Sequence, residues 1–262
     1  MEFNLEPTIT ETEASMDISK RHSPDNPPWG AIVGIGFWIL SVFFILFFNA
    51  AFILLYSKYA GALKQEEDLF RPDVVIVVLL STIPAHLNTL AVAILIVFRF
   101  GKYKFDDVLG SRLNGFNIFH LVGILIPLYG IIFGLSHFLG VKETAFQKLI
   151  SSSNEAMILM AVIGTLSAPI VEEVVYRGIL FGGVVKKSNN LVGVIVVTTL
   201  FAAVHFPQYR EDAATLISIT IVSLALTLVR VYWKSLMPCI IVHFVFNGIQ
   251  SLVLLAQMYG PK

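Results

Sequence analysis

Long apolar stretches separated by short polar segments make up the chain from about residue 29 onward. An α-helix rises about 1.5 Å per residue, so about 20 mostly apolar residues cross the hydrocarbon core of a bilayer. Pro169 lies within the fourth stretch, and an eighth span results if this proline divides it. The pattern therefore predicts an all-α transmembrane helical bundle with seven spans, at residues 30–56, 73–98, 116–139, 154–185, 191–206, 212–232 and 236–258.

The first 28 residues differ from the rest of the chain. They lack apolar periodicity, their acidic side chains outnumber the basic ones, and they end in a cluster of prolines. Such a segment cannot bury enough apolar surface to fold by itself. We therefore expect a disordered acidic tail at residues 1–28 and a transmembrane domain at residues 29–262.

Composition and charge support a membrane location. Hydrophobic residues make up 56% of the chain and charged residues only 14%, against about 25% charged residues in a typical soluble domain. The formal net charge is zero, so no basic field argues for a nucleic-acid partner. Apart from Arg177, the basic residues favour the side of the N-terminus by ten to seven. This bias predicts a multi-pass protein in the lipid bilayer with its N-terminus in the cytoplasm.

The fourth span contains three ionisable side chains, Glu172, Glu173 and Arg177. A charge in hydrocarbon costs about 2.5–3.5 kcal/mol on insertion scales, so these residues should face a partner or a cavity. Glu173 precedes Arg177 by four residues, which is the favourable order for a helical ion pair. Glu172 points about 140° away from Arg177 around the helix. An ion pair that only holds helices together would leave Glu172 unexplained, so we predict that Glu172 is reactive and that the pair supports it.

Two later spans contain His205 and the pair His243 and Asn247, which share one helical face. A single histidine in or near a span is usually an interfacial residue or a helix-to-helix contact, and we assign one of these two roles to His86 in the second span. Counted from the span ends on one membrane side, however, Glu172, His205 and Asn247 lie roughly 18–21 Å deep and His243 roughly 12 Å deep. Their similar depth predicts one shared polar site.

At these positions the chain resembles the CPBP (Abi) family of intramembrane proteases, which includes CAAX prenyl proteases and bacteriocin-processing enzymes. The likeness covers about residues 155–250 and implies a protease-like core at about 154–258. Within the family, the chain is similar to type II CAAX prenyl endopeptidase. Three motifs in the family's order carry it, namely Glu172-Glu173-x-x-x-Arg177, Phe201-x-x-x-His205 and His243-x-x-x-Asn247.

The resemblance implies an intramembrane endopeptidase that hydrolyses a peptide bond of a membrane-associated, prenylated or unprenylated, peptide or protein. By analogy Glu172 is the general base that activates water, and His205 is the second contact to that water. His243 and Asn247 would stabilise the oxyanion. The chemistry is coherent on its own terms, because hydrolysis requires a base beside water and donors aimed at the developing charge.

Metal dependence and two other functions stay open. The metal-binding motif His-Glu-x-x-His is absent, yet Glu172, His205 and His243 could supply three ligands to a catalytic zinc ion. We favour a metal-free site. Buried acids and histidines also serve proton relays in transporters, although we find no internal repeat. A non-catalytic scaffold or immunity protein on the same fold is the other alternative.

Overall fold

The computed structural model describes residues 22–60, 71–99, 104–256 and 258. Within them, seven helices are long and apolar enough to cross a membrane. The described residues contain no β-strand, only an isolated bridge between Ser23 and Asn26. The protein is thus an all-helical, multi-pass membrane protein, as the apolar pattern predicts. Each candidate span agrees with its predicted range to within about three residues at either end.

Six single helices and one composite helix form these spans. The fourth span is a continuous run of five segments: α7 (Asn154–Val162), η2 (Ile163–Ser167), α8 (Ala168–Glu173), η3 (Val174–Leu180) and α9 (Phe181–Val185). The other helices, two of them short, are α2 (Ala31–Ala60), α3 (Pro72–Arg99), α4 (Phe105–Leu109), α5 (Ile118–Leu139), α6 (Ala145–Ile150), α10 (Asn190–Tyr209), α11 (Ala213–Trp233) and α12 (Leu236–Ala256).

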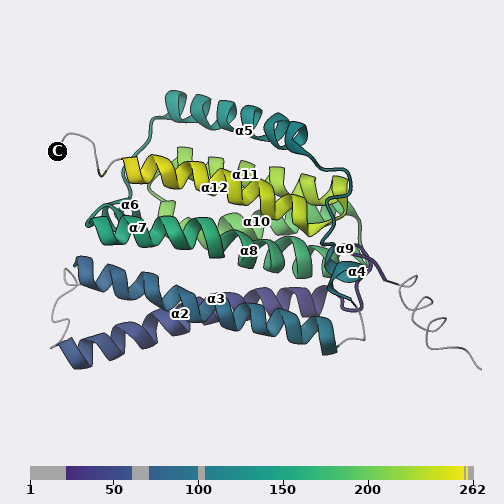
Figure 1. The fold of residues 1–262 in the computed structure, drawn as a ribbon, viewed down its shortest axis with the longest axis horizontal. Coiled ribbons are helices and arrows are strands. Elements are labelled where there is room, and N and C mark those ends of the chain that lie inside the picture. The colour runs from purple at the N-terminus through teal and green to yellow at the C-terminus, as the bar shows by residue number, and fades with distance from the viewer. Residues whose placement is uncertain (1–21, 61–70, 100–103, 257, 259–262) are drawn as a thin grey trace, which may run out of the picture.

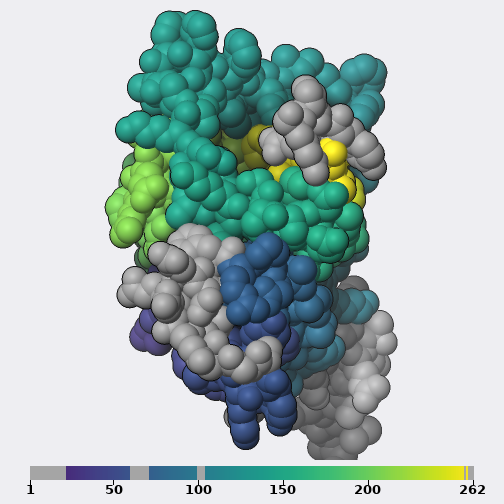
Figure 2. Space-filling model, turned by 90° about the vertical axis from the view of Figure 1, so that its left-hand side faces the viewer, coloured from purple at the N-terminus to yellow at the C-terminus, as the bar shows by residue number. Residues whose placement is uncertain are grey.

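The helices stack in layers (Figure 1). The antiparallel pair α2 and α3 forms one outer layer, and α5 forms the opposite one. The composite helix lies between them, in contact with α2, α3, α10 and α12. Figure 2 views one end of the stack, with the blue atoms of α2 and α3 below the teal and green atoms of the later elements. This arrangement surrounds the composite helix with other helices, which explains how it can hold charged side chains.

Two π-helical segments interrupt the composite helix, and Pro169 follows the first of them. A proline has no N–H to donate and its ring crowds the carbonyl four residues earlier. The π turn relieves this conflict locally, since the N–H of Ala168 bonds Ile163 O five residues back. The helix therefore continues past Pro169, and the alternative of an eighth span does not apply to the described residues.

A tight turn fixes the start of α12, which carries His243 and Asn247. Lys234 ends α11 in the left-handed conformation, with φ of 49°. Ser235 Oγ then donates to Gly110 O at 2.9 Å, and Leu236 N donates to the same carbonyl at 2.8 Å. A Cβ at Gly110 would lie 2.8 Å from Ser235 Cα, so only glycine fits there. The loop after α4 thus sets the level at which α12 begins.

The end of the predicted tail differs from the prediction. Residues 1–21 lie outside the described part of the chain, whereas residues 22–28 pack against the bundle. Asp25 forms an ion pair with Arg230 of α11 at 2.8 Å. Pro24 and Pro27 lie against the backbone of Gly182. The prolines do not mark disorder here, because their fixed backbone suits a close approach to a glycine on a helix.

Gly193 permits the closest helix packing at the α9–α10 turn, and its replacement should destabilise the fold. A Cβ there would lie 2.5 Å from Val185 Cγ1 and 2.7 Å from Phe181 Cε2. Gly193→Ala should therefore lower the free energy of unfolding by about 1–3 kcal/mol through overpacking. Thermal unfolding in detergent measures this, with Gly130→Ala as the control because nothing lies within 4 Å of that position. Equal melting of the two variants would contradict the packing.

Candidate active site

A buried ion pair on the composite helix anchors the site. Arg177 Nη1 donates to Glu173 Oε1 at 2.9 Å, and both side chains are fully buried. The guanidinium also donates to Ser223 O and Ser223 Oγ at 2.9 Å and to Thr227 Oγ1 at 3.3 Å. Its carbon lies 4.9 Å from the ring centroid of Phe201. The predicted pair is therefore present, and α11 provides most of the remaining partners of Arg177.

His243 lies between the two glutamates. Its Nδ1 is 2.7 Å from Glu173 Oε1, and its Nε2 is 3.8 Å from Glu172 Oε2. Glu173 Oε1 also accepts from Arg177 Nη1, and a carboxylate oxygen can only accept, so Nδ1 donates this hydrogen bond. Glu173 thereby fixes the ring and directs Nε2 towards Glu172.

The two carboxylates consequently have different surroundings. Glu173 has a buried arginine and a histidine as partners, and its side chain is 0% exposed. Glu172 has His243 at the longer distance and keeps 25% of its side chain exposed. Helical spacing predicts the asymmetry, but it does not predict that one histidine contacts both acids. Of the two, Glu172 is the carboxylate that remains partly exposed.

His205 joins the site through an aromatic stack. Its Nδ1 donates to Phe201 O one turn earlier at 2.8 Å, and its ring stacks on Phe201 with centroids 4.7 Å apart. The Phe201 ring in turn meets His243 edge-on at 6.5 Å. No hydrogen bond joins His205 to Glu172 among the described residues. The bond to Phe201 leaves Nε2 of the neutral ring as an acceptor.

Asn247 is held by the first π segment. Its Nδ2 donates to Gly164 O at 2.8 Å. One turn later on α12, Ser251 Oγ lies 2.8 Å from Thr165 Oγ1 of the same segment. α12 therefore contacts the composite helix at two levels, with His243 beside α8 and Asn247 beside η2. The amide keeps one N–H and its oxygen for other partners.

Sequence reasoning missed three polar residues on α11. Ser223, Thr227 and Arg230 follow a spacing of four and three residues on α11, so they share one face towards the composite helix. This spacing could have been recognised in the sequence as a polar helix face. His86 of α3 bonds Ser167 Oγ at 3.0 Å, as expected of a helix-to-helix contact.

Glu172, His205 and His243, the three residues that could bind a zinc ion by their chemistry, do not form a metal-binding arrangement in this structure. Among the described residues, no three histidine, cysteine, aspartate or glutamate side chains have an arrangement that could hold a metal ion. Glu172 and His243 are neighbours, but His205 faces Phe201 instead. We therefore derive no step through a metal.

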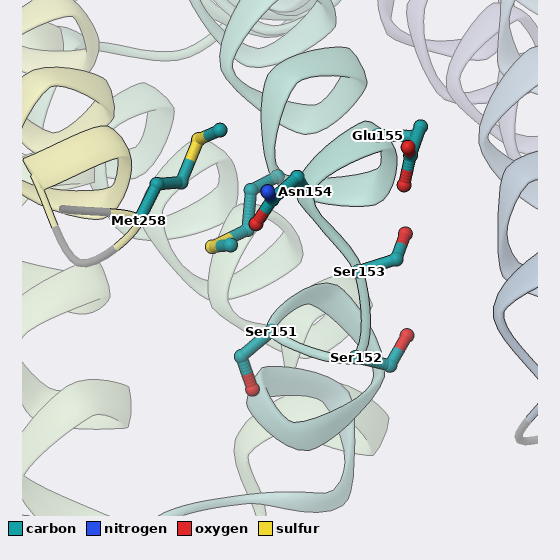
Figure 3. Close-up of a pocket in the computed structure, with 7 residues that line it drawn as sticks. Ser151, Ser152, Ser153, Asn154, Glu155 and Met258 are labelled. Atoms are coloured by element: carbon teal, nitrogen blue, oxygen red, sulfur yellow. The ribbon is translucent and has the colours of Figure 1, made fainter. Parts of the chain in front are cut away.

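A cavity of about 390 Å³ lies away from this site, where the composite helix begins. Figure 3 shows its polar lining, which includes the hydroxyls of Ser151 and Ser152, together with Met258. Glu155, also in the lining, precedes Glu172 by roughly 25 Å along the helix. The cavity does not contact the candidate catalytic groups.

The fold and the site define a polytopic membrane protein with acid, histidine and amide side chains gathered inside its helical bundle. Residues 154–249 match the family model described as "Type II CAAX prenyl endopeptidase Rce1-like". This part of the chain belongs to that family, which indicates an intramembrane peptidase. No curated protein and no solved structure matches the chain.

Proposed function

We propose that this protein is an intramembrane endopeptidase in which Glu172 activates the attacking water. The observation that carries the proposal is the difference between the two adjacent glutamates around His243. Glu173 Oε1 contacts Arg177 at 2.9 Å and His243 at 2.7 Å, whereas the Glu172 side chain stays partly exposed. A general base must be free to bind water and take its proton, and Glu172 meets that requirement.

The reaction follows from these positions. Glu172 takes a proton from water, and the resulting hydroxide attacks the carbonyl carbon of the scissile peptide bond. The carbonyl oxygen becomes an oxyanion in a tetrahedral intermediate. As the C–N bond breaks, Glu172 returns its proton to the leaving nitrogen. The carboxylate is thereby regenerated, and the products are a carboxylic acid and an amine.

The other polar side chains bind the oxyanion and the water. We assign His243 and Asn247 to the oxyanion and His205 to the water. Donors held in advance stabilise an oxyanion without reorganising at the moment of reaction. The bond from His243 Nδ1 to Glu173 provides such preorganisation.

The proposed substrate is a membrane-associated peptide or protein with a prenylated CAAX terminus. The matched family description names a CAAX prenyl endopeptidase. Apolar side chains cover the outside of the helices, so a lipid-anchored substrate would approach within the bilayer. We also propose a cytoplasmic N-terminus, because basic residues are more frequent on the N-terminal side of the membrane.

Cleavage of a farnesylated CAAX peptide by the purified protein in detergent tests the proposal. We expect cleavage that survives a chelator and is much weaker for the same peptide without its lipid. Loss of activity with chelator and recovery with zinc would instead make Glu172, His205 and His243 metal ligands. Failure to cleave prenylated and bacteriocin-like peptides alike would favour the proton-relay transporter or the non-catalytic scaffold.

A further inference from the structure

The π segment η3, which carries Arg177, has two carbonyls that accept hydrogen bonds from outside the composite helix. Trp29 Nε1 donates to Ile179 O at 3.0 Å, and Arg230 Nε donates to Arg177 O at 3.2 Å. Trp29 is 1% exposed and Arg230 is fully buried. A π turn departs from the usual hydrogen-bond pattern of an α-helix. The two external donors therefore bind the backbone at Arg177, whose side chain holds Glu173, and at Ile179, two residues later.

Both donors depend on the segment that precedes α2. Trp29 belongs to residues 22–30, which we call the N-terminal segment. Arg230 belongs to α11, but its guanidinium pairs with Asp25 of the N-terminal segment at 2.8 Å and lies 5.2 Å from the Phe181 ring centroid. The contact to Asp25 is an ion pair without an aligned hydrogen bond. Asp25 thus supplies the negative charge beside a buried arginine.

Glycines allow the N-terminal segment to lie directly on the composite helix. A Cβ at Gly182 would be 2.8 Å from Pro24 O, and a Cβ at Gly183 would be 2.8 Å from Gly30 O. The purple start of the described chain runs beside α9 in Figure 1. Gly182 in the sequence is typical of helix-to-helix packing, but its neighbour is this segment. The contact is backbone against backbone, which leaves little freedom for η3 to shift.

A continuous set of contacts joins this segment to the candidate base. Asp25 pairs with Arg230, and Arg230 bonds the backbone of Arg177. The Arg177 side chain bonds Glu173 at 2.9 Å, Glu173 bonds His243 at 2.7 Å, and His243 faces Glu172 at 3.8 Å. Every side chain between Asp25 and Glu172 in this series is at least 96% buried. A substitution at Asp25 should therefore change the position of the His243 side chain.

We propose that Asp25 and Arg230 are positioning residues for the peptidase site, and that the N-terminal segment is part of the catalytic unit. This inference rests on the proposed function. The segment lies before the matched residues 154–249, so the family match does not include it. Asp25 would hold Arg230 against the carbonyl of Arg177. That contact would fix η3 at the level where Arg177 presents Glu173 to His243.

Kinetics of Asp25→Asn in the full-length protein test the inference. We expect kcat to fall by about 10- to 100-fold with KM nearly unchanged, because a small misplacement of catalytic groups lowers the rate while substrate binding persists. Asp25→Glu keeps the charge and should recover most of the rate. Trp29→Phe removes the other external donor and should also lower kcat. Asp107→Asn is the matched control, since it removes a carboxylate from α4 outside this series of contacts.

The single cysteine of the chain separates positioning from loss of packing. Cys239 is fully buried, contacts Leu226 O at 3.5 Å and precedes His243 by one turn. Lower kcat with Cys239 still protected from a maleimide supports the inference. Lower kcat with matching alkylation of Cys239 would overturn it in favour of a general packing role. If Asp25→Asn has the kcat and KM of the wild type, this inference is wrong and the proposed function is unaffected. If the wild-type protein is itself inactive, both the proposed function and this inference are wrong.

Discussion

Glu172→Gln should lower kcat for peptide cleavage by about 10²–10⁴-fold, the usual contribution of a general base. Glutamine keeps the size of the side chain but cannot accept a proton from water. The imidazole of His243 lies 3.8 Å from the Glu172 carboxylate, whose side chain is a quarter exposed, so the variant should remain folded. Initial rates with a prenylated peptide, measured beside the melting temperature in detergent, give both quantities.

Glu155→Gln is the matched control for that loss. It removes an exposed carboxylate from the same composite helix and should leave the rate unchanged. If Glu172→Gln keeps the wild-type rate while Glu173→Gln loses it, the roles of the two glutamates are reversed. If both keep the rate, the catalytic base lies elsewhere and the proposed function fails.

Arg177→Met should produce the largest loss of stability, about 3–5 kcal/mol in the free energy of unfolding. Removing one partner of a buried pair leaves the other as an uncompensated charge in a low-dielectric interior. Here that charge is Glu173, which is 0% exposed and keeps the imidazole of His243 as its side-chain partner. Denaturant-dependent unfolding in mixed micelles measures the change.

Two further variants make this prediction specific. In Glu173→Gln/Arg177→Met both charges are absent, so the loss should be much smaller than for Arg177→Met alone. Arg112→Met also breaks an ion pair, with Asp106, but this arginine side chain is 78% exposed and the change should cost about 0–1 kcal/mol. An Arg177→Met protein as stable as Arg112→Met would show that Glu173 is not charged in the folded state.

The sequence predicts the spans and the principal ion pair because each depends on spacing along one helix. Apolar length alone predicts seven helices close to their observed bounds. The four-residue spacing of Glu173 and Arg177 predicts their contact, since an α-helix brings such residues onto one face. Depth counting predicts one shared site, because helices in a bilayer share common boundaries. It places Asn247 at the level of Glu172, however, whereas His243 is the residue of α12 that contacts both glutamates.

The remaining features depend on departures from regular geometry and on contacts between distant segments. Two π segments change the direction of side chains beyond Gly164, and hydrophobicity does not reveal them. The contact of His243 with both glutamates depends on where α12 starts, which Gly110 fixes from a remote loop. Asp25 is one of several acidic residues in the segment 1–28, so the sequence does not single it out. Its partner, Arg230, is 205 positions later.

The lengths of the helices give the protein an uneven hydrophobic thickness. The first span, Ala31–Tyr59, has 29 residues and would be roughly 44 Å long, whereas the 20 residues of Asn190–Tyr209 give roughly 30 Å. The hydrocarbon core of a bilayer is about 30 Å thick. Lipid around α2 must therefore thicken, or α2 must tilt, while lipid around α10 stays unstrained. The acyl-chain length of the host membrane consequently acts on one flank of this protein more than on the other.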